Sequence, residues 1–342
     1  MKKRVDLGTI AEKVGVSKTT VHYALHQPER LGKETLEKVL AAVKELGYRP
    51  NLLARSLRTR RSNIVGIICT RLDCPYFAPF FEVTARAAQE FGYAVFAGTS
   101  GGCAAREREL VELALAHGID GVIILPNESE ENGDFYRDLL GEQAPFIFVE
   151  HSVPGVETDC VGTDDFLGGQ IVARRLVEVG RRKVAFLAPP GEARDCRWVC
   201  DRRDGCNQAL AEAGIEPAAE MDHGSGEDPR LDRCGYEATR HCLSSNDGYD
   251  GLFAANDALA WGALQASAEA GLEVGRDLSV IGFDDSQPDS YVAPPLSSMR
   301  HPLAEIGREA MRLLLVRIEE PSAPPTRALL APELVIRSSC MR

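Results

Sequence analysis

Short apolar runs that alternate with longer amphipathic segments constrain the fold of this chain more than any other feature. Seven such runs follow Asn63, with stretches of helical spacing between them. Strands that alternate with helices form parallel sheets, because a crossover helix must return the chain to the start of the next strand. The predicted strands are residues 64–69, 94–97, 122–125, 146–149, 184–187, 252–254 and 280–283. This part of the chain therefore predicts two doubly wound α/β units that face each other.

A ligand pocket is expected between these two units. In open parallel sheets, ligands bind outside the carboxyl ends of the strands. The residues that follow the predicted strands are therefore pocket candidates: Tyr76, Phe77, Asp164, Asn256, Asp257 and Asp284, with His151 as a further one. No glycine-rich dinucleotide loop, phosphate-binding loop or nucleophile elbow accompanies the strands. The pattern predicts binding, with neither catalytic residues nor a cofactor.

Residues 1–50 have a different pattern, with three predicted helices. Apolar residues at helical spacing mark a first helix that ends at Gly15, and Ser17 offers a hydroxyl N-cap to a short second helix. The third helix ends before Gly47, and its apolar seam is Leu36, Val39, Leu40, Val43 and Leu46. Two short helices joined by a glycine-containing turn are typical of a helix-turn-helix, whose second helix enters the DNA major groove.

The charge distribution favours DNA binding by this region alone. The whole chain has a formal net charge of −12. Residues 1–61 contain fourteen Lys or Arg and six Asp or Glu, a net +8, whereas the remainder contains 25 basic and 45 acidic residues, a net −20. A phosphate backbone attracts the first part and repels the second. On charge alone, a solvated basic face without a DNA partner is the alternative interpretation.

Six short motifs carry a resemblance to a known family. They are VGVSKTTV at 14–21, ELGYRPN at 45–51, ARSLR at 54–58, AND at 255–257, SVIGFDD at 279–285 and PPL at 294–296. Together they resemble the lactose-repressor (LacI/GalR) family of bacterial transcription regulators. The resemblance implies an all-α helix-turn-helix head and a two-lobed body like that of periplasmic binding proteins. It also implies a homodimer that binds double-stranded operator DNA under the control of a small-molecule effector.

The predicted DNA contacts lie on the polar face of the second helix and in residues 51–58. They are Ser17, Lys18, Thr19, Thr20, His22, Tyr23, Asn51, Arg55, Leu57 and Arg58. The family usually has an arginine where this chain has Tyr23, and tyrosine cannot make the bidentate contact of arginine to guanine. The operator sequence of other members therefore does not carry over to this chain.

Residues 51–58 resemble the hinge helix of the family, which folds on DNA and inserts a leucine into the minor groove. Leu57 has the position of that leucine. An apolar wedge there kinks the duplex by partly unstacking a base step. The alternative is a basic linker in which Leu57 merely covers the body.

Three residues of the body are of special interest as effector contacts. Arg202 and Asp257 align with effector-contacting residues of the family, and together they offer the donors and acceptors that suit sugar hydroxyls. Trp198, one helical turn before Arg202, is placed to stack on a sugar ring. The alternatives are a surface salt bridge for Arg202, a helix N-cap for Asp257 and core packing for Trp198. A sugar or sugar derivative is the predicted effector.

The resemblance also implies that the chain crosses between the lobes three times, near residues 162, 290 and 322. The predicted domains are 1–50 for the helix-turn-helix, 51–62 for the hinge helix and linker, 63–162 with 291–321 for the first lobe, and 163–290 with 322–342 for the second lobe. Prolines within 294–295 and 321–325 mark the last two crossings as turns.

Two other functions fit the sequence less well. A solute-binding protein needs export, but charged residues interrupt any apolar segment after the basic start of the chain. An enzyme needs an acid–base pair or a nucleophile, and no such arrangement is evident. No run approaches the ~18 apolar residues of a membrane-spanning helix. The ten cysteines have no zinc-binding spacing. We expect a cytoplasmic regulator with free thiols and no bound metal.

Overall fold

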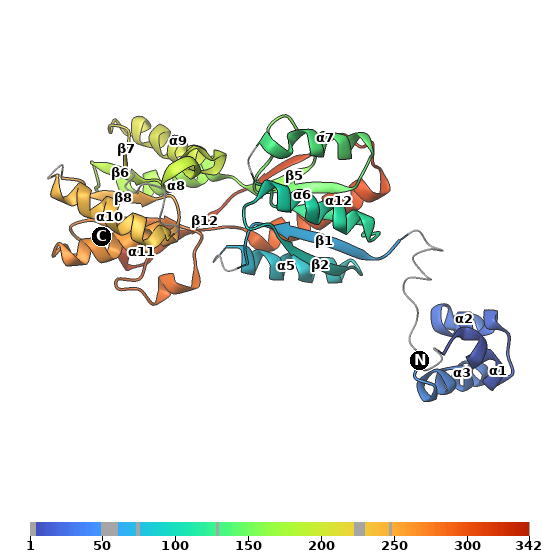
Figure 1. Ribbon diagram of the computed structural model, residues 1–342. Helices are drawn as coiled ribbons and strands as arrows, with labels where there is room; N and C mark the ends of the chain where they lie inside the picture. Colours follow the sequence, from blue (N-terminus) through green and yellow to red (C-terminus); the bar gives the residue numbers. More distant parts are fainter. Residues whose placement is uncertain are drawn as a thin grey trace. The chain divides into compact units, whose positions relative to one another are not determined.

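The computed structural model describes residues 5–48, 61–72, 76–127, 130–221, 230–245 and 248–341. The chain divides into two compact units, residues 1–62 and 63–342, and each is described by itself (Figure 1). The first unit is an all-α head, and the second contains two six-stranded sheets, one in each of two lobes. Within the described residues, no helix has both the length and the apolar character needed to cross a membrane.

Within residues 5–48, the head contains three α-helices and one short 3-10 helix. These are α1 (Leu7–Val14), α2 (Lys18–His26), η1 (Pro28–Arg30) and α3 (Lys33–Glu45). The Ser17 hydroxyl accepts a 3.0 Å hydrogen bond from the Thr20 amide, which confirms the predicted N-cap of α2. Gly15, with φ 74°, ends α1 in the left-handed conformation that glycine adopts without strain.

One side chain from each helix is completely buried at the centre of the head: Ile10, Val21 and Val39. The predicted seam of α3 is correct except at Leu40, whose side chain is 44% exposed. Ala42 is buried in the core of the head instead. The head therefore has a small core.

The first lobe contains a parallel sheet in the order β11-β5-β4-β3-β1-β2. The strands are β1 (Ile64–Cys69), β2 (Ala94–Thr99), β3 (Gly121–Ile124), β4 (Phe146–Val149), β5 (Cys160–Thr163) and β11 (Arg327–Leu330). The helices are α5 (Phe77–Glu90), α6 (Ala104–Ala116), η2 (Glu130–Asn132), α7 (Gly133–Gly141) and α12 (Leu303–Glu319). Strand residues alternate between one core with α5 and α12 and another with α6 and α7, so helices cover both faces.

The second lobe contains a sheet in the order β12-β10-β9-β8-β6-β7, in which only the β10–β12 pair is antiparallel. The strands are β6 (Val184–Leu187), β7 (Ala219–Met221), β8 (Gly251–Ala254), β9 (Ser279–Phe283), β10 (Ser297–Arg300) and β12 (Glu333–Val335). The helices are α8 (Asp165–Glu178), η3 (Gly191–Asp195), α9 (Arg197–Glu212), α10 (Leu231–Ser244), α11 (Asp257–Glu269), η4 (Gln287–Ser290) and η5 (Ser338–Cys340). The seven predicted strands are all present, with small shifts at their ends, and the α/β prediction is confirmed.

The chain crosses between the lobes three times, but two crossings differ from the prediction. The first follows Thr163 at the end of β5, next to the predicted position. Because β10 pairs with β9 and β11 pairs with β5, the second crossing follows Arg300 and the third follows Leu330. The boundaries expected near 290 and 322 are therefore wrong, and so is the assignment of 291–300 to the first lobe and of 322–330 to the second. The prolines mark turns that precede one more strand in the same lobe.

Candidate functional site

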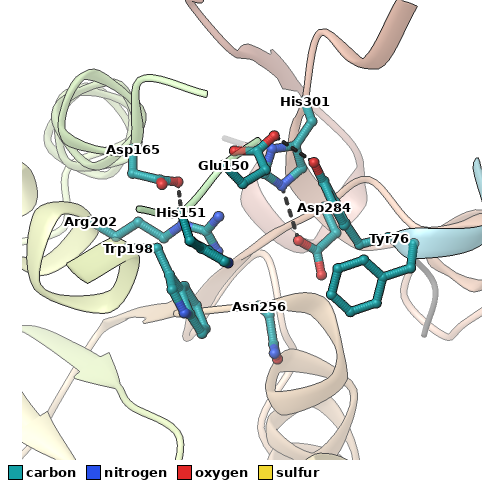
Figure 2. Close-up of a pocket in the computed structure, with 10 residues that line it drawn as sticks. Tyr76, Glu150, His151, Asp165, Trp198, Arg202, Asn256, Asp284 and His301 are labelled. Atoms are coloured by element: carbon teal, nitrogen blue, oxygen red, sulfur yellow. Dashed lines mark hydrogen bonds and ion pairs between the residues drawn. The ribbon is translucent and has the colours of Figure 1, made fainter. Parts of the chain in front are cut away.

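A cavity of about 200 Å³ lies where the two lobes face each other (Figure 2). It is lined by Tyr76, Phe77, Glu150 and His151 of the first lobe, by Asp165, Trp198, Arg202, Asn256 and Asp284 of the second, and by His301 at the second crossing. Most of these residues follow the carboxyl end of a strand, as expected for doubly wound sheets. Six of the eight predicted effector contacts therefore line one cavity.

Two glycines bring α8 and α9 together beside this cavity. A Cβ atom on Gly169 would lie 2.0 Å from the carbonyl oxygen of Arg202, and one on Gly205 would lie 2.0 Å from that of Phe166. Any larger residue would force the two backbones apart. This close approach places Arg202 of α9 next to Asp165, the first residue of α8.

Arg202 is buried, with only 4% of its surface exposed. Its Nε donates to Asp165 Oδ1 (2.8 Å) and its Nη1 donates to the carbonyl oxygen of Ala255 (2.6 Å). The guanidinium carbon lies 3.5 Å from the ring centroid of Phe283 and 4.7 Å from that of Trp198. The alternative of a surface salt bridge is wrong. Burial raises the pKa of Asp165, and the charge of Arg202 partly offsets that rise.

A chain of hydrogen bonds connects the two lobes through His301. The Tyr76 hydroxyl donates to Glu150 Oε1 (2.5 Å), which also accepts from the Thr163 hydroxyl (3.2 Å). Thr163 Oγ1 lies 2.6 Å from His301 Nδ1, and His301 Nε2 lies 3.1 Å from Asp284 Oδ1. Thr163 and His301 stand at the first and second crossings. The polar residues that line the cavity are thus hydrogen-bonded to two of the segments that join the lobes.

Three residues of this hydrogen-bond chain have an unusual pKa or an unusual backbone conformation. Loss of hydration, together with the negative charge of Glu150, raises the pKa of Tyr76 well above its usual value, so the phenol stays a hydrogen-bond donor. Glu150 (φ 61°) and Asp284 (φ 124°) adopt backbone conformations that are unusual for residues with side chains. Strained backbone of this kind concentrates at functional sites.

Asp257 does not line the cavity, although the sequence predicts it as an effector contact. It is completely buried; its Oδ1 accepts from the Ser298 hydroxyl (2.5 Å) and its Oδ2 accepts from the Ser286 amide (2.8 Å). Both carboxylate oxygens are therefore occupied within the second lobe. The helix N-cap considered as its alternative is also wrong, because Asn256 fills that role through its bond to the Leu259 amide (3.0 Å).

Asp164 also lies outside this cavity. Its side chain accepts from the Leu167 amide (2.9 Å) as the N-cap of α8, and it lines an adjoining cavity. Glu150, Asp165 and His301 are absent from the predicted set. Glu150 directly follows β4, so the rule that selected the other candidates also selects it. His301 follows β10, whose polar sequence does not predict a strand, so the same rule does not select His301.

The polar face predicted for α2 is present. Ser17, Lys18 and Thr19 are exposed, whereas Thr20, His22 and Tyr23 are half-buried. Arg30 covers the ring of Tyr23, with its guanidinium carbon 5.2 Å from the ring centroid. Among the predicted DNA contacts of α2, Lys18 and Thr19 are therefore more accessible than His22 and Tyr23. The other predicted DNA contacts, Asn51, Arg55, Leu57 and Arg58, lie outside the described residues, as does most of the expected hinge.

The cysteine and histidine residues give no metal centre in the part of the chain that the structure describes. There, no group of three or more His, Cys, Asp or Glu side chains is arranged to hold an ion. Nine cysteines of this part are free thiols. Burial raises the pKa of Cys160 and of Cys206 to about 12, so these two thiols stay protonated at neutral pH.

A helix-turn-helix head combined with a two-lobed α/β body that holds a cavity defines a class, the ligand-responsive transcription regulators. Two family descriptions match the chain: "Bacterial regulatory proteins, lacI family" over residues 7–51, and the periplasmic binding protein-like domain over residues 173–340. The chain is 30% identical to the HTH-type transcriptional repressor PurR of Mannheimia succiniciproducens, over 96% of this chain and 97% of that protein. It belongs to the lacI family of bacterial regulatory proteins and is a DNA-binding transcription regulator.

Solved structures agree with this assignment. The lac repressor dimer bound to operator and the anti-inducer ONPF matches with a TM-score of 0.84 and 26% identity, over 99% of this chain and 100% of that chain. The complex of the transcriptional regulator CelR with cellobiose matches with a TM-score of 0.68 and 28% identity, over 98% and 100% of the two chains. These similarities confirm the predicted fold of both units.

Proposed function

We propose that this protein is an operator-binding repressor whose DNA affinity is set by a small molecule held between its two lobes. The observation that carries the proposal is the cavity, whose walls come from both lobes and whose polar chain reaches two of the three crossings. A ligand that contacts both lobes prefers one lobe arrangement and shifts the equilibrium by its differential affinity. DNA binding falls to α2 and residues 51–58, in a homodimer that reads a palindromic operator in the cytoplasm.

The charges around the cavity favour a neutral or cationic effector. Three carboxylates line it, those of Glu150, Asp165 and Asp284, against the single guanidinium of Arg202. Two N–H groups of Arg202 already donate hydrogen bonds, one to Asp165 and one to a backbone carbonyl oxygen. A phosphorylated or carboxylated ligand would face an excess of negative charge, and like charges placed together are costly.

A neutral sugar fits this chemistry best. Tyr76, Phe77 and Trp198 offer rings for the apolar face of a pyranose, while the amide nitrogen of Asn256 offers a donor and the carboxylate of Asp284 offers an acceptor for hydroxyl groups. The volume of about 200 Å³ lies below the ~300–1,000 Å³ typical of drug-sized ligands, so a single small ring fits the cavity. The similar CelR structure contains cellobiose.

A purine base is the second candidate. It is favoured by the name of the curated relatives, PurR, at 30% identity over nearly the whole chain. A purine is also neutral, and its planar ring suits the same aromatic walls.

The test is a thermal-shift screen of the full-length protein against neutral monosaccharides, purine bases and their phosphorylated counterparts. We expect a neutral compound to raise the melting temperature and to change operator affinity, and its phosphorylated form to do neither. Asp284→Asn should abolish both effects, whereas the exposed control Glu109→Gln should retain them. A protein stabilised most by phosphorylated ligands, or one that chemically converts its ligand, would contradict the proposal.

A further inference from the structure

A second cavity of about 240 Å³ adjoins the effector cavity. The two share Glu150, His151, Asp165 and Trp198 in their walls, so they meet at these four residues. The second cavity has walls from both lobes as well, because β11 belongs to the first lobe and α8 to the second. It is therefore a continuation of the space between the lobes.

Two large apolar side chains are exposed in this second cavity. Phe166 of α8 is 38% exposed, and Leu329 of β11 is 49% exposed. Single exposed apolar residues are ordinary on a protein surface. Here one from each lobe lines the same hollow, next to a ligand-sized cavity, and apolar groups rimmed by polar ones in a cleft are typical of a ligand site.

The second cavity also offers a cation that has no partner of its own. Arg327 is exposed and makes no hydrogen bond or ion pair with another residue that the structure describes. Arg197, the other arginine of this cavity, is held by both oxygens of Asp201 at 2.9 Å. Arg327 is thus free to donate hydrogen bonds to a ligand.

The joint charge of the two cavities limits what they can hold. Their walls contain five carboxylates and three guanidinium groups, an excess of two negative charges. The carboxylates are those of Glu150, Asp164, Asp165, Asp201 and Asp284, and the guanidinium groups are those of Arg197, Arg202 and Arg327. An anionic extension of the effector is therefore disfavoured, whereas a neutral ring with hydroxyl groups meets acceptors, one free donor and two apolar contacts.

We propose that the second cavity is a subsite for a second ring, and that the effector is a neutral glycoside. One ring occupies the cavity beside Arg202, and the other lies between Phe166 and Leu329 with Arg327 donating to its hydroxyl groups. Trp198, which lines both cavities, contacts both rings. This inference rests on the proposed function. A disaccharide, which is an O-glycoside, and a nucleoside, which is an N-glycoside, share this chemistry.

The test compares one-ring and two-ring ligands on the full-length protein by calorimetry. The pairs are glucose with cellobiose and hypoxanthine with inosine, and the pair that binds identifies the kind of glycoside. Inosine monophosphate serves as the charged control. We expect the two-ring member to bind about 10-fold tighter or more, the effect of one hydrogen bond to a charged donor, and the phosphorylated compound to bind more weakly than inosine.

Variants in the second cavity separate the subsite from the main cavity. Phe166→Ala and Arg327→Gln should each reduce the preference for the two-ring ligand and leave the affinity for the one-ring ligand unchanged. Phe91→Ala and Arg106→Gln, which change exposed residues of the same types elsewhere, should retain the preference.

Equal affinity for one-ring and two-ring ligands, or a preference that survives both cavity variants, overturns the subsite while leaving the one-ring repressor intact. If no compound of either size binds or alters operator affinity, the subsite and the proposed function are both overturned.

Discussion

Asp257 shows at the scale of one residue how burial changes the chemistry of a side chain. Ionised carboxylates are costly to bury, yet Asp257 is completely buried. Burial, and then the negative charges of Asp284 and Asp289, raise its pKa well above the usual value. Burial also raises the pKa of Asp289, whose carboxyl group is one of those that act on Asp257. The folded protein holds a proton there that the unfolded chain releases.

This raised pKa predicts a loss of stability as the pH increases. The stabilising contribution of the protonated Asp257 carboxyl group is fully present below the ordinary aspartate pKa of about 4. It is lost as the pH rises through the pKa that Asp257 has in the folded protein. Between those values, one proton changes the free energy of unfolding by about 1.4 kcal/mol per pH unit. We expect Asp257→Asn, which mimics the protonated form, to flatten this slope in urea denaturation from pH 5 to 8. Parallel curves for the two proteins would contradict the prediction.

Tyr23 is the second residue whose identity carries a prediction. It stands where the family places a guanine-reading arginine, and Arg30 covers its ring. We expect Tyr23→Arg to shift the operator preference toward guanine at one position of each half-site, by about 1–3 kcal/mol if a bidentate contact forms. Selection from randomised operators measures the shift. Arg30→Gln is the control, because it removes the contact without adding a base reader; the same consensus for Tyr23→Arg and wild type would refute the role.

At the scale of elements, the pocket depends on how closely α8 and α9 pack. Gly169 permits an approach that no side chain would allow, since a Cβ there would overlap the carbonyl oxygen of Arg202. The same contact seats the Arg202 guanidinium between Asp165 and two aromatic rings. The close packing of α8 and α9 therefore fixes the position of the Arg202 side chain in the cavity wall.

Gly169→Ala should therefore weaken both folding and binding. We expect it to lower the free energy of unfolding by about 1–3 kcal/mol, the usual cost of overpacking a tight core, and to weaken effector binding because Arg202 moves. Gly141→Ala, at the end of α7, is the control: its new Cβ meets open space, so its stability should stay within about 1 kcal/mol of wild type. Chemical denaturation and calorimetry measure the two effects. Unchanged stability and effector affinity in Gly169→Ala would show that the close packing is dispensable.

At the scale of the whole molecule, charge and packing separate the DNA-binding part from the ligand-binding part. Residues 1–61 carry +8 and the remainder −20. Residues 1–62 and 63–342 form separate compact units, and among the described residues each hydrophobic core is made of side chains from one unit. Each unit therefore contains what its own folding needs.

Deleting residues 1–61 should abolish operator binding and leave a folded body that still binds effector. Because the basic head neutralises phosphates, the operator affinity of the full chain should also fall steeply with salt. A plot of the logarithm of the association constant against the logarithm of the salt concentration should have a slope of about −0.9 per phosphate contacted. Gel-shift titrations at several salt concentrations and a thermal melt of the truncated body measure these effects. Specific DNA binding by the truncated body would refute the division of roles.

Local periodicity is enough to predict the head helices, the central strands and the class of fold. Runs such as Val184–Leu187 are apolar throughout and carry their own signal. The strands that were missed, β5, β7, β10, β11 and β12, are short, and β10 has the sequence Ser-Ser-Met-Arg. Such segments become strands only because a neighbouring strand accepts them, which is a property of the assembled sheet.

The lobe crossings and the roles of individual polar residues follow from packing between distant segments, which local sequence patterns do not contain. Proline turns at 294–295 and 321–325 look alike in sequence whether the next segment changes lobe or adds a strand. Likewise, Asp257 and Asp284 both follow buried strands. Asp257 is hydrogen-bonded to Ser286 and Ser298, whereas Asp284 lines the cavity. A strand end tells only which edge of the sheet a side chain lies on; whether it meets ligand or protein depends on the segments that pack over that edge.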